Sequence, residues 1–417
     1  MKRIVAFPAA LLVLLALAAP VYGQSIADRL KQKIKDKASQ TKSDAQTKAE
    51  DTAENPSANS DKPADAQPAA DAAPVQDAAA PAANAAAPDA ATAPPAPVSI
   101  KAYQNYDFTP GDTILFADDF TETQDGEFPE QWELLKGQGV VNKQQGYQAM
   151  LLTDGNYVQV SPRMTNKTYL GPQFTIEYDT FFEGGAYPTL VFLETGDNES
   201  IISVNDSEAD YSNGADSYSL SGSLPTAISS DNYHDKWHHI AIAVKNKQLK
   251  VYVDQYRVLT VPDMHTQPES MRMGGIGAQD TPLIFRNVRV ASGGGMNMLG
   301  QKFTGAKIVT HGINFDIDKA TLRPESMGTL NQIVAVLNAN PDLKFEIDGH
   351  TDNSGAAAHN LTLSQQRADA VKAQLITMGV AAGRLTTKGL GDTKPMSPND
   401  TPANKANNRR VEFVKIS

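Results

Sequence analysis

Residues 344–379 read KFEIDGHTDNSGAAAHNLTLSQQRADAVKAQLITMG, and this stretch decides the fold of the C-terminal part of the chain. The alternating run KFEIDGH predicts a strand, and the Gly-, Asn- and Ser-rich turn after it predicts a loop. The segment LSQQRADAVKAQLITMG, which Gly379 ends, predicts a helix. Asp352 is therefore expected in a loop directly after a strand, and Arg367 on the helix that follows.

Arg367 is expected at the edge of the apolar face of that helix. On a wheel of about 100° per residue, the core face is made of Leu363, Ala368, Val371, Leu375 and Met378. The stem of Arg367 is then part-buried, and its guanidinium needs an acceptor. Two interpretations follow: Asp352 and Arg367 form a structural ion pair, or together they grip a ligand that carries an amine and a carboxylate. The Gly- and Asn-rich loop favours the second, because its backbone N–H groups also serve a ligand.

Strands and helices alternate through the rest of this region. Strands are predicted over 306–316, 384–391 and 409–416, and a helix over 323–341 with Pro324 in its first turn. Within about 115 residues this order, βαβαββ, is typical of a compact α/β two-layer sandwich.

The middle of the chain has a different pattern. Short period-two runs such as TILFADDF (113–120), FTIEYDTFF (174–182) and HHIAIAVK (238–245) are bounded by Gly, Pro, Asn and Asp. No helical pattern separates them, so we expect an all-β jelly-roll sandwich over residues 101–295, closed by the Gly-rich joint SGGG at 292–295.

The N-terminal hundred residues contain no predicted core. Lys2 and Arg3 precede an apolar run, which predicts a cleaved secretory signal over residues 1–23, an uncleaved anchor being the alternative. Over residues 24–100 we expect an amphipathic helix (25–49), either solvated or resting on an anionic surface or partner helix, and then a disordered Ala/Pro-rich linker.

Composition excludes several classes of function. The 417 residues carry a net charge of -11 and no cysteine. An acidic chain lacks the basic face that a nucleic-acid partner requires. Without cysteine the chain has no disulfide, no catalytic thiol, no Cys-ligated zinc and no acylated lipoprotein anchor.

The C-terminal region resembles the OmpA C-terminal-like, peptidoglycan-binding family from about Phe303 to Lys415. The resemblance rests on six motifs in order: FDIDKATLRPES (315–326), GHTDNSG (349–355), N-x-x-LS-x-x-RA-x-x-V (360–371), G-V-x-x-x-R-L (379–385), KGLGDTKP (388–395) and NRRVEF (408–413). It implies an OmpA-like domain over residues 303–417 that binds the diaminopimelate of the peptidoglycan stem peptide.

The resemblance also implies roles for individual residues. Asp352 would accept from the ligand's ammonium, and Arg367 would take its carboxylate in a fork-shaped pair. Asp318 and Leu363 match further positions that line the pocket, and Arg409 matches a supporting arginine near the acid. The chain departs from relatives at Ala357–Ala358–His359, where larger or aromatic residues are frequent, which leaves the side-wall contacts open.

The middle region resembles the concanavalin A-like or laminin-G-like sandwiches, most specifically in KWHHIAIAVKNKQLKVYVD (236–254). Such domains bind sugars or proteins, and some hold calcium, for which Asp118 and Asp119 are the candidates, with a surface turn as the alternative. Trp132 and Trp237 fit the core better than a sugar platform.

Glu177, Asp179 and Glu183 resemble the acid cluster of laminarinase-like hydrolases, but with wider spacing. Along a regular strand Glu177 and Glu183 would lie about 20 Å apart, whereas a retaining glycosidase needs carboxyls about 5 Å apart. We therefore interpret these acids as a solvated strand face.

The sequence thus predicts a non-enzymatic protein, exported to the cell envelope and associated with the periplasm or outer membrane. It would bind peptidoglycan with its last domain and a glycan or protein with its middle domain, without a required cofactor. The alternatives are a glycoside hydrolase that the last domain targets, and a structural adhesin.

Overall fold

The computed structural model describes residue 103 and residues 106–294 and 303–416. The predicted signal, amphipathic helix and linker lie outside the described residues. Two regions are described: the β-rich region (106–294) and the C-terminal α/β region (303–416). Both belong to one compact unit. Within the described residues no helix has the length and hydropathy that a membrane crossing needs.

The β-rich region is built from thirteen strands and two short 3-10 turns. The strands are β1 (Thr113–Asp118), β2 (Trp132–Gln144), β3 (Tyr147–Pro162), β4 (Gln173–Phe182), β5 (Thr189–Thr195), β6 (Asn198–Val204), β7 (Glu208–Asn213), β8 (Ser219–Ser223), β9 (Lys236–Lys245), β10 (Gln248–Val253), β11 (Tyr256–Val261), β12 (Ser270–Gly277) and β13 (Leu283–Ser292). The turns are η2 (Thr226–Ile228) and η3 (Ser230–Asn232).

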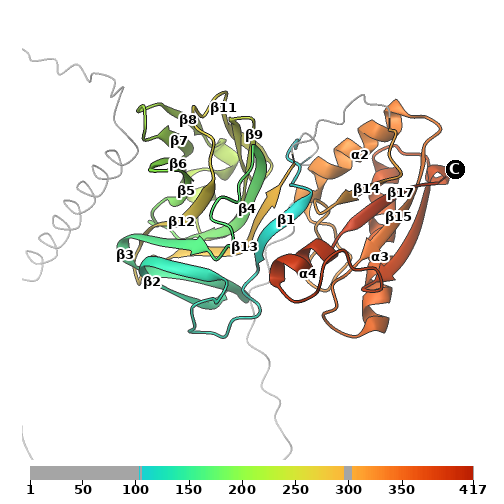
Figure 1. The fold of residues 1–417 in the computed structure, drawn as a ribbon, viewed down its shortest axis with the longest axis horizontal. Coiled ribbons are helices and arrows are strands. Elements are labelled where there is room, and N and C mark those ends of the chain that lie inside the picture. The colour runs from blue at the N-terminus through green and yellow to red at the C-terminus, as the bar shows by residue number, and fades with distance from the viewer. Residues whose placement is uncertain (1–102, 104–105, 295–302, 417) are drawn as a thin grey trace, which may run out of the picture. The chain divides into compact units, whose positions relative to one another are not determined.

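These strands form one antiparallel sheet in the order β11-β10-β9-β4-β13-β3-β12-β5-β6-β7-β8, with β1 on β13 and β2 on β3 (Figure 1). The two ends of this order approach each other. A Cβ atom on Gly222 of β8 would lie 1.8 Å from the carbonyl oxygen of Val258 on β11, so only glycine permits this approach. The sheet thereby wraps around one large apolar core, which includes Trp132 as predicted.

Strand β4 is buried on both faces. Phe174, Ile176 and Tyr178 point into the large core. The opposite face carries Glu177 and Asp179, each with only 2% of its surface exposed. The prediction of a solvated strand face was therefore wrong. Residues of the C-terminal α/β region cover this face, a long-range contact that strand periodicity does not reveal.

A buried ionic cluster, defined here as Glu177, Asp179, His239, Arg286 and Arg289, occupies that covered face. Arg289 donates to both oxygens of Glu177, at 2.9 and 2.8 Å. Arg286 and Asn287 donate to Oδ2 of Asp179 at 3.1 and 2.7 Å. Each buried carboxylate thus has an opposite charge, which removes most of the penalty for leaving water.

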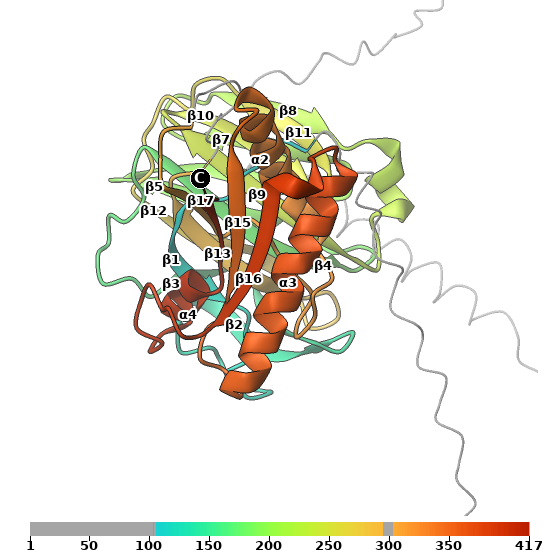
Figure 2. The same cartoon turned by 90° about the vertical axis from the view of Figure 1, so that its right-hand side faces the viewer.

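The C-terminal α/β region has four strands, three α-helices and two short 3-10 turns. They are β14 (Lys307–Thr310), η4 (Pro324–Ser326) leading into α2 (Met327–Ala339), β15 (Lys344–His350), α3 (Ala357–Thr377), η5 (Ala382–Arg384), β16 (Leu385–Gly391), α4 (Pro402–Asn408) and β17 (Val411–Ile416). The sheet order is β14-β17-β15-β16, with β15 and β16 parallel. Figure 2 shows α3 running alongside β16.

This order corrects the predicted βαβαββ pattern in three places. The first strand is only four residues long, because the chain turns at His311 towards an isolated bridge between Phe315 and Leu322. Helix α3 begins at Ala357, six residues before the predicted start, since Ala357 and Ala358 favour helix and extend it. The short helix α4 was not predicted, although Thr401 caps it and Pro402 occupies its first position.

Residues before the first strand pack on α2. Phe108 belongs to the same apolar cluster as Leu330 and Ile333 of α2. A Cβ atom on Gly328 would lie 1.7 Å from the carbonyl oxygen of Phe108, so glycine allows this close crossing. The cluster also contains Ala241 and Tyr252 of the sheet, so apolar packing joins the two regions beside the ionic cluster.

The pH dependence of folding should report on His239. Burial alone would lower the pKa of this histidine, but its hydrogen bond to Asp179 and its closeness to Glu177 raise the pKa to about 10. A histidine whose pKa is higher in the folded state stabilises that state fully at pH values below its unfolded-state pKa of about 6.5. This stabilisation is lost as the pH rises through 10. We expect the unfolding midpoint to fall by about 5 °C or more between pH 6.5 and 9.5.

The variant His239→Gln isolates this effect, because it keeps a polar side chain that does not titrate. Its unfolding midpoint should be lower than that of the unaltered chain at pH 6.5 and should depend less on pH up to 9.5. Differential scanning calorimetry at both pH values provides the measurement. Equal pH slopes for the two proteins would contradict the assignment of a charged His239.

Candidate functional site

Asp352 lies where β15 ends and the loop to α3 begins. It is buried, with 6% of its surface exposed. Oδ1 accepts the N–H of Ser354 at 2.8 Å, and Oδ2 accepts from Arg409 Nη1 at 2.7 Å. Burial alone would raise the pKa of Asp352, but the bonds from Arg409 and Ser354 outweigh it and hold the pKa below its ordinary value. The carboxylate is therefore ionised at neutral pH.

The local backbone fixes Asp352 from the α3 side. Asn360, in the first turns of α3, donates to the carbonyl of Asp352 at 3.2 Å. Three residues before Asp352, at the first residue of the GHTDN motif, β15 passes very close to α3. A Cβ atom on Gly349 would lie 2.2 Å from the carbonyl oxygen of Ser364, so the glycine lets strand and helix touch. This explains why the acid and the arginine motif of α3 come together.

Arg367 is half-buried on α3 and turns toward the loop after β14, not toward Asp352. Nε donates to the carbonyl of Lys319 at 2.9 Å, and Nη2 lies 3.5 Å from the carbonyl of Asp316. The guanidinium lies 5.0 Å from the ring centroid of Phe315. Burial and the charge of Arg409 lower the pKa of Arg367, while Asp318 and Asp352 are near enough to oppose this. In the part of the chain described, no carboxylate forms an ion pair with Arg367.

Asp318 lies in the same loop and is exposed. Its φ of 54° places it in the left-handed region, which aspartate tolerates better than most residues. His359 Nε2, from the first turn of α3, is 2.6 Å from Asp318 Oδ1. The residue that departs from the family pattern therefore contacts one of the implied ligand-lining residues.

The five predicted residues divide into three kinds. Asp352 and Arg409 are ion-paired, and Arg367 and Asp318 lie around the loop that faces α3. Leu363 is 8% exposed on the inner side of α3. Sequence reasoning missed the carbonyls of Asp316 and Lys319, because every residue has a backbone carbonyl and the residue type gives no signal of its role. It also missed the ring of Phe315. His359 was singled out only as a departure, although a histidine one helical turn before Leu363 was a usable signal.

The alternative interpretation, a structural ion pair between Asp352 and Arg367, is not found among the described residues. The arginine of the NRR motif takes the acid instead, because Arg409 follows α4 directly and reaches the loop from the other side. What remains is a carboxylate compensated by one arginine and, separate from it, the Arg367 guanidinium, held by two carbonyls and the ring of Phe315. Such an arrangement can receive a small molecule carrying both charges.

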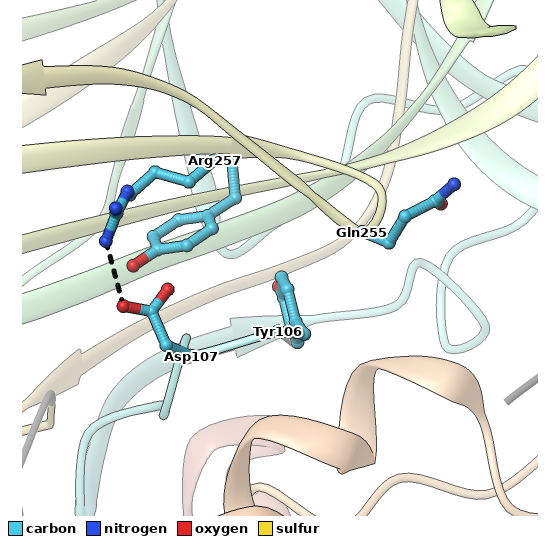
Figure 3. Close-up of a pocket in the computed structure, with 5 residues that line it drawn as sticks. Tyr106, Asp107, Gln255 and Arg257 are labelled. Carbon is cyan, nitrogen blue, oxygen red and sulfur yellow. Dashed lines mark hydrogen bonds and ion pairs between the residues drawn. The ribbon is translucent and has the colours of Figure 1, made fainter. Parts of the chain in front are cut away.

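A hollow of about 230 Å³ lies elsewhere, lined by Tyr106, Asp107, Tyr252, Gln255 and Arg257. In Figure 3 the Arg257 guanidinium reaches the Asp107 carboxylate, at 3.0 Å. Lys250 lies 3.3 Å from the same carboxylate. These charges satisfy one another and fasten the segment before β1 to the β10–β11 hairpin, so the hollow is structural.

The acid cluster considered for hydrolysis is not arranged for catalysis. Glu177 and Asp179 are buried and held by arginines. Burial alone would raise the pKa of Glu177, but the charge of Arg289 outweighs it and lowers the pKa to about 2. Glu183 lies beyond the end of β4. A general acid needs a raised pKa and access to substrate, and Glu177 has neither.

The candidate calcium ligands are also engaged. Asp118 is buried and accepts from the N–H of Phe120 at 2.8 Å and from Trp132 Nε1 at 3.0 Å. Asp119 accepts a hydrogen bond from the backbone N–H of Thr121, two residues later in the same turn. Among the residues that the structure describes, no cluster of three or more His, Asp or Glu side chains is arranged to hold a metal ion.

Comparison with known proteins places the site in a family context. Residues 314–409 match the model of the OmpA family. The chain is 44% identical over 102 residues to the probable lipoprotein YiaD of Escherichia coli, covering 24% of this chain and 47% of that protein. It is also 44% identical over 102 residues to the peptidoglycan-binding protein ArfA of Mycobacterium tuberculosis, covering 24% of this chain and 31% of that protein.

A solved structure, that of the peptidoglycan-associated lipoprotein from Burkholderia pseudomallei, is 32% identical, with a TM-score of 0.24 over 25% of this chain and 88% of that chain. The chain spans less than half of the two curated relatives described above. All five site residues lie within the stretch that the family model matches. The C-terminal part of this chain, residues 314–409, is an OmpA family domain.

Proposed function

We propose that this protein is a non-catalytic cell-envelope protein that binds peptidoglycan through the diaminopimelate of the stem peptide. The single observation that carries the proposal is the half-buried guanidinium of Arg367, which has no carboxylate partner among the described residues. A ligand carboxylate would supply that partner. The name of the relative ArfA, a peptidoglycan-binding protein, supports the choice of ligand.

The two charged groups at the end of the ligand's side chain match two different parts of the site. Diaminopimelate carries an ammonium and a carboxylate on one carbon at the end of its side chain. The carboxylate would take a fork-shaped pair with Arg367, whose Nη1 has no hydrogen-bond partner in the described part of the chain. The ammonium would donate to Asp352, whose lowered pKa keeps it ionised, and to Asp318.

Leu363 and Arg409 would act in support. Leu363 would give the pocket an apolar wall. Arg409 would hold Asp352 in place, and its hydrogen bond leaves other lone pairs of the carboxylate able to accept from the ligand. Charge-assisted hydrogen bonds contribute about 1.5–3 kcal/mol each. Two or three of them, less the cost of association, correspond to micromolar to millimolar binding of a fragment. Rebinding on a dense cell wall would strengthen retention.

We further propose that the division into a signal (1–23), a linker (24–100), a middle domain (101–295) and an OmpA-like domain (303–417) describes the chain. The middle domain would be a concanavalin A-like or laminin-G-like sandwich that recognises a glycan or an envelope protein. Export to the periplasm or outer membrane agrees with the names of relatives such as outer membrane protein A of Bordetella avium. The proposal requires no cofactor, and the buried Glu177 argues against the hydrolase alternative.

The first test removes each charged partner in turn. Arg367→Ala and Asp352→Ala should each weaken binding of the full chain to purified diaminopimelate-type sacculi by about tenfold or more, because each loses charge-assisted bonds. Free diaminopimelate should compete with the unaltered chain. Arg257→Ala is the matched control, since it removes an arginine far from the site. Undiminished binding by both site variants would leave only the structural adhesin.

The second test changes the ligand instead of the protein. A stem peptide with lysine in place of diaminopimelate keeps the ammonium but lacks the carboxylate that Arg367 would take. We expect it to bind at least about tenfold more weakly, measured by isothermal titration calorimetry. With Arg367→Ala the preference between the two peptides should largely disappear. Equal affinity of the unaltered chain for both peptides would refute the assignment of Arg367.

A further inference from the structure

We infer that the β-rich region positions the stem-peptide site, with Asp179 of β4 and Ile114 of β1 as the two points where it contacts the walls of that site. This inference rests on the proposed function. It assigns Arg323 and Asn407 as positioning residues, which hold ligand-binding groups in place without touching the ligand themselves.

The first wall is the loop from Asn314 to Arg323. Its ends are joined by the bridge between Phe315 and Leu322 and by the N–H of Arg323, which donates to Asn314 at 2.9 Å. A further bond runs from the N–H of Asp316 to Thr321 at 3.1 Å. This closed loop provides the carbonyls and the ring that hold Arg367, so the position of the loop decides where the guanidinium lies.

The side chain of Arg323 ties this loop to the β-rich region. Its Nη2 lies 2.9 Å from Glu325, in the turn η4 before α2, and 3.5 Å from Asp179 of β4. Arg323 keeps only 27% of its side chain exposed, and although burial alone would lower its pKa, Glu325 and Asp179 raise the pKa above its ordinary value. Asp179 cannot move freely, because His239, Arg286 and Asn287 also bind it.

The second wall is the end of α4. The amide of Asn407 makes two hydrogen bonds with the backbone of β1: it accepts from the N–H of Ile114 at 3.0 Å and donates to its carbonyl at 2.9 Å. The carbonyl of Asn407 also receives His311 Nε2 at 2.9 Å. Arg409 follows two residues later and binds Asp352.

The two contacts act on the two halves of the proposed ligand. The Asp179–Arg323 contact fixes the loop behind Arg367, which would hold the carboxylate. The Ile114–Asn407 contact fixes the helix end that carries Arg409, and through it Asp352, which would hold the ammonium. The β-rich region therefore sets the spacing between the two charged groups, and a loosened contact weakens binding by lowering pre-organisation.

The test uses the full chain and a muramyl tripeptide that carries meso-diaminopimelate. Arg323→Gln and Asp179→Asn remove the first contact from either side; both keep a polar side chain, and Asp179→Asn also keeps its shape. Each should weaken binding by about threefold to tenfold, which is the range of such coupling. The double variant should lose no more affinity than the single variant that binds less tightly, because both substitutions break the same Asp179–Arg323 contact. Arg257→Gln, which breaks an exposed ion pair elsewhere, is the matched control and should bind normally.

A purely structural role would change stability without changing affinity, so unfolding midpoints are measured for each variant. Arg323→Lys keeps the charge and should recover at least part of the affinity lost in Arg323→Gln. If Asp179→Asn fails to fold, the three Arg323 and Arg257 variants still decide the question. Binding of Arg323→Gln within twofold of the unaltered chain would overturn the inference, provided that Arg367→Ala binds poorly. Normal binding by Arg367→Ala would instead overturn the proposed function.

Discussion

A carboxylate that leaves water must meet positive charge, and the burial of Asp179 is the constraint on which much of this structure depends. His239, Arg286 and Asn287 of the β-rich region form hydrogen bonds with its two oxygens. Arg323 approaches it from the C-terminal region, 144 residues along the chain. The same acid thus completes the packing of one sheet face and orients the loop on which Arg367 rests.

Sequence patterns predicted most strands of the β-rich region but not its covered face. The runs that became β4, β9 and β10 were recognised because their alternation is regular. Strand β12, SMRMGGIG, was missed because Gly274 and Gly275 lack the side chains that mark a strand. In the structure, the absence of a side chain at Gly275 allows the carbonyl of Pro188 to approach. Whether Glu177 meets solvent depends on residues far away in the chain, and no local pattern carries that information.

The sequence supplied candidate residues for the site but not the contacts that hold them in place. The order of motifs in the C-terminal region predicted that Asp352, Arg367 and Arg409 serve one site, and the structure places Arg409 on Asp352. The partner of Arg367 was not predictable from its own helix, because it consists of the backbone carbonyls of Asp316 and Lys319. Their direction follows from the turn at Asp318, whose positive φ emerges only in three dimensions.

A small binding site gains most when its charged groups are held in place before the ligand arrives. Each long side chain that must be ordered on binding costs about 0.5–1.5 kcal/mol, a large share of the few charge-assisted bonds that a single amino acid can make. Arg367 is already fixed by two carbonyls and a ring, and Asp352 by Arg409 and Ser354. The loop and the helix end behind these groups are in turn fixed by β4 and β1. Under the proposed function, the β-rich region would raise the affinity for the stem peptide through these supports, by reducing the freedom that the site would otherwise lose.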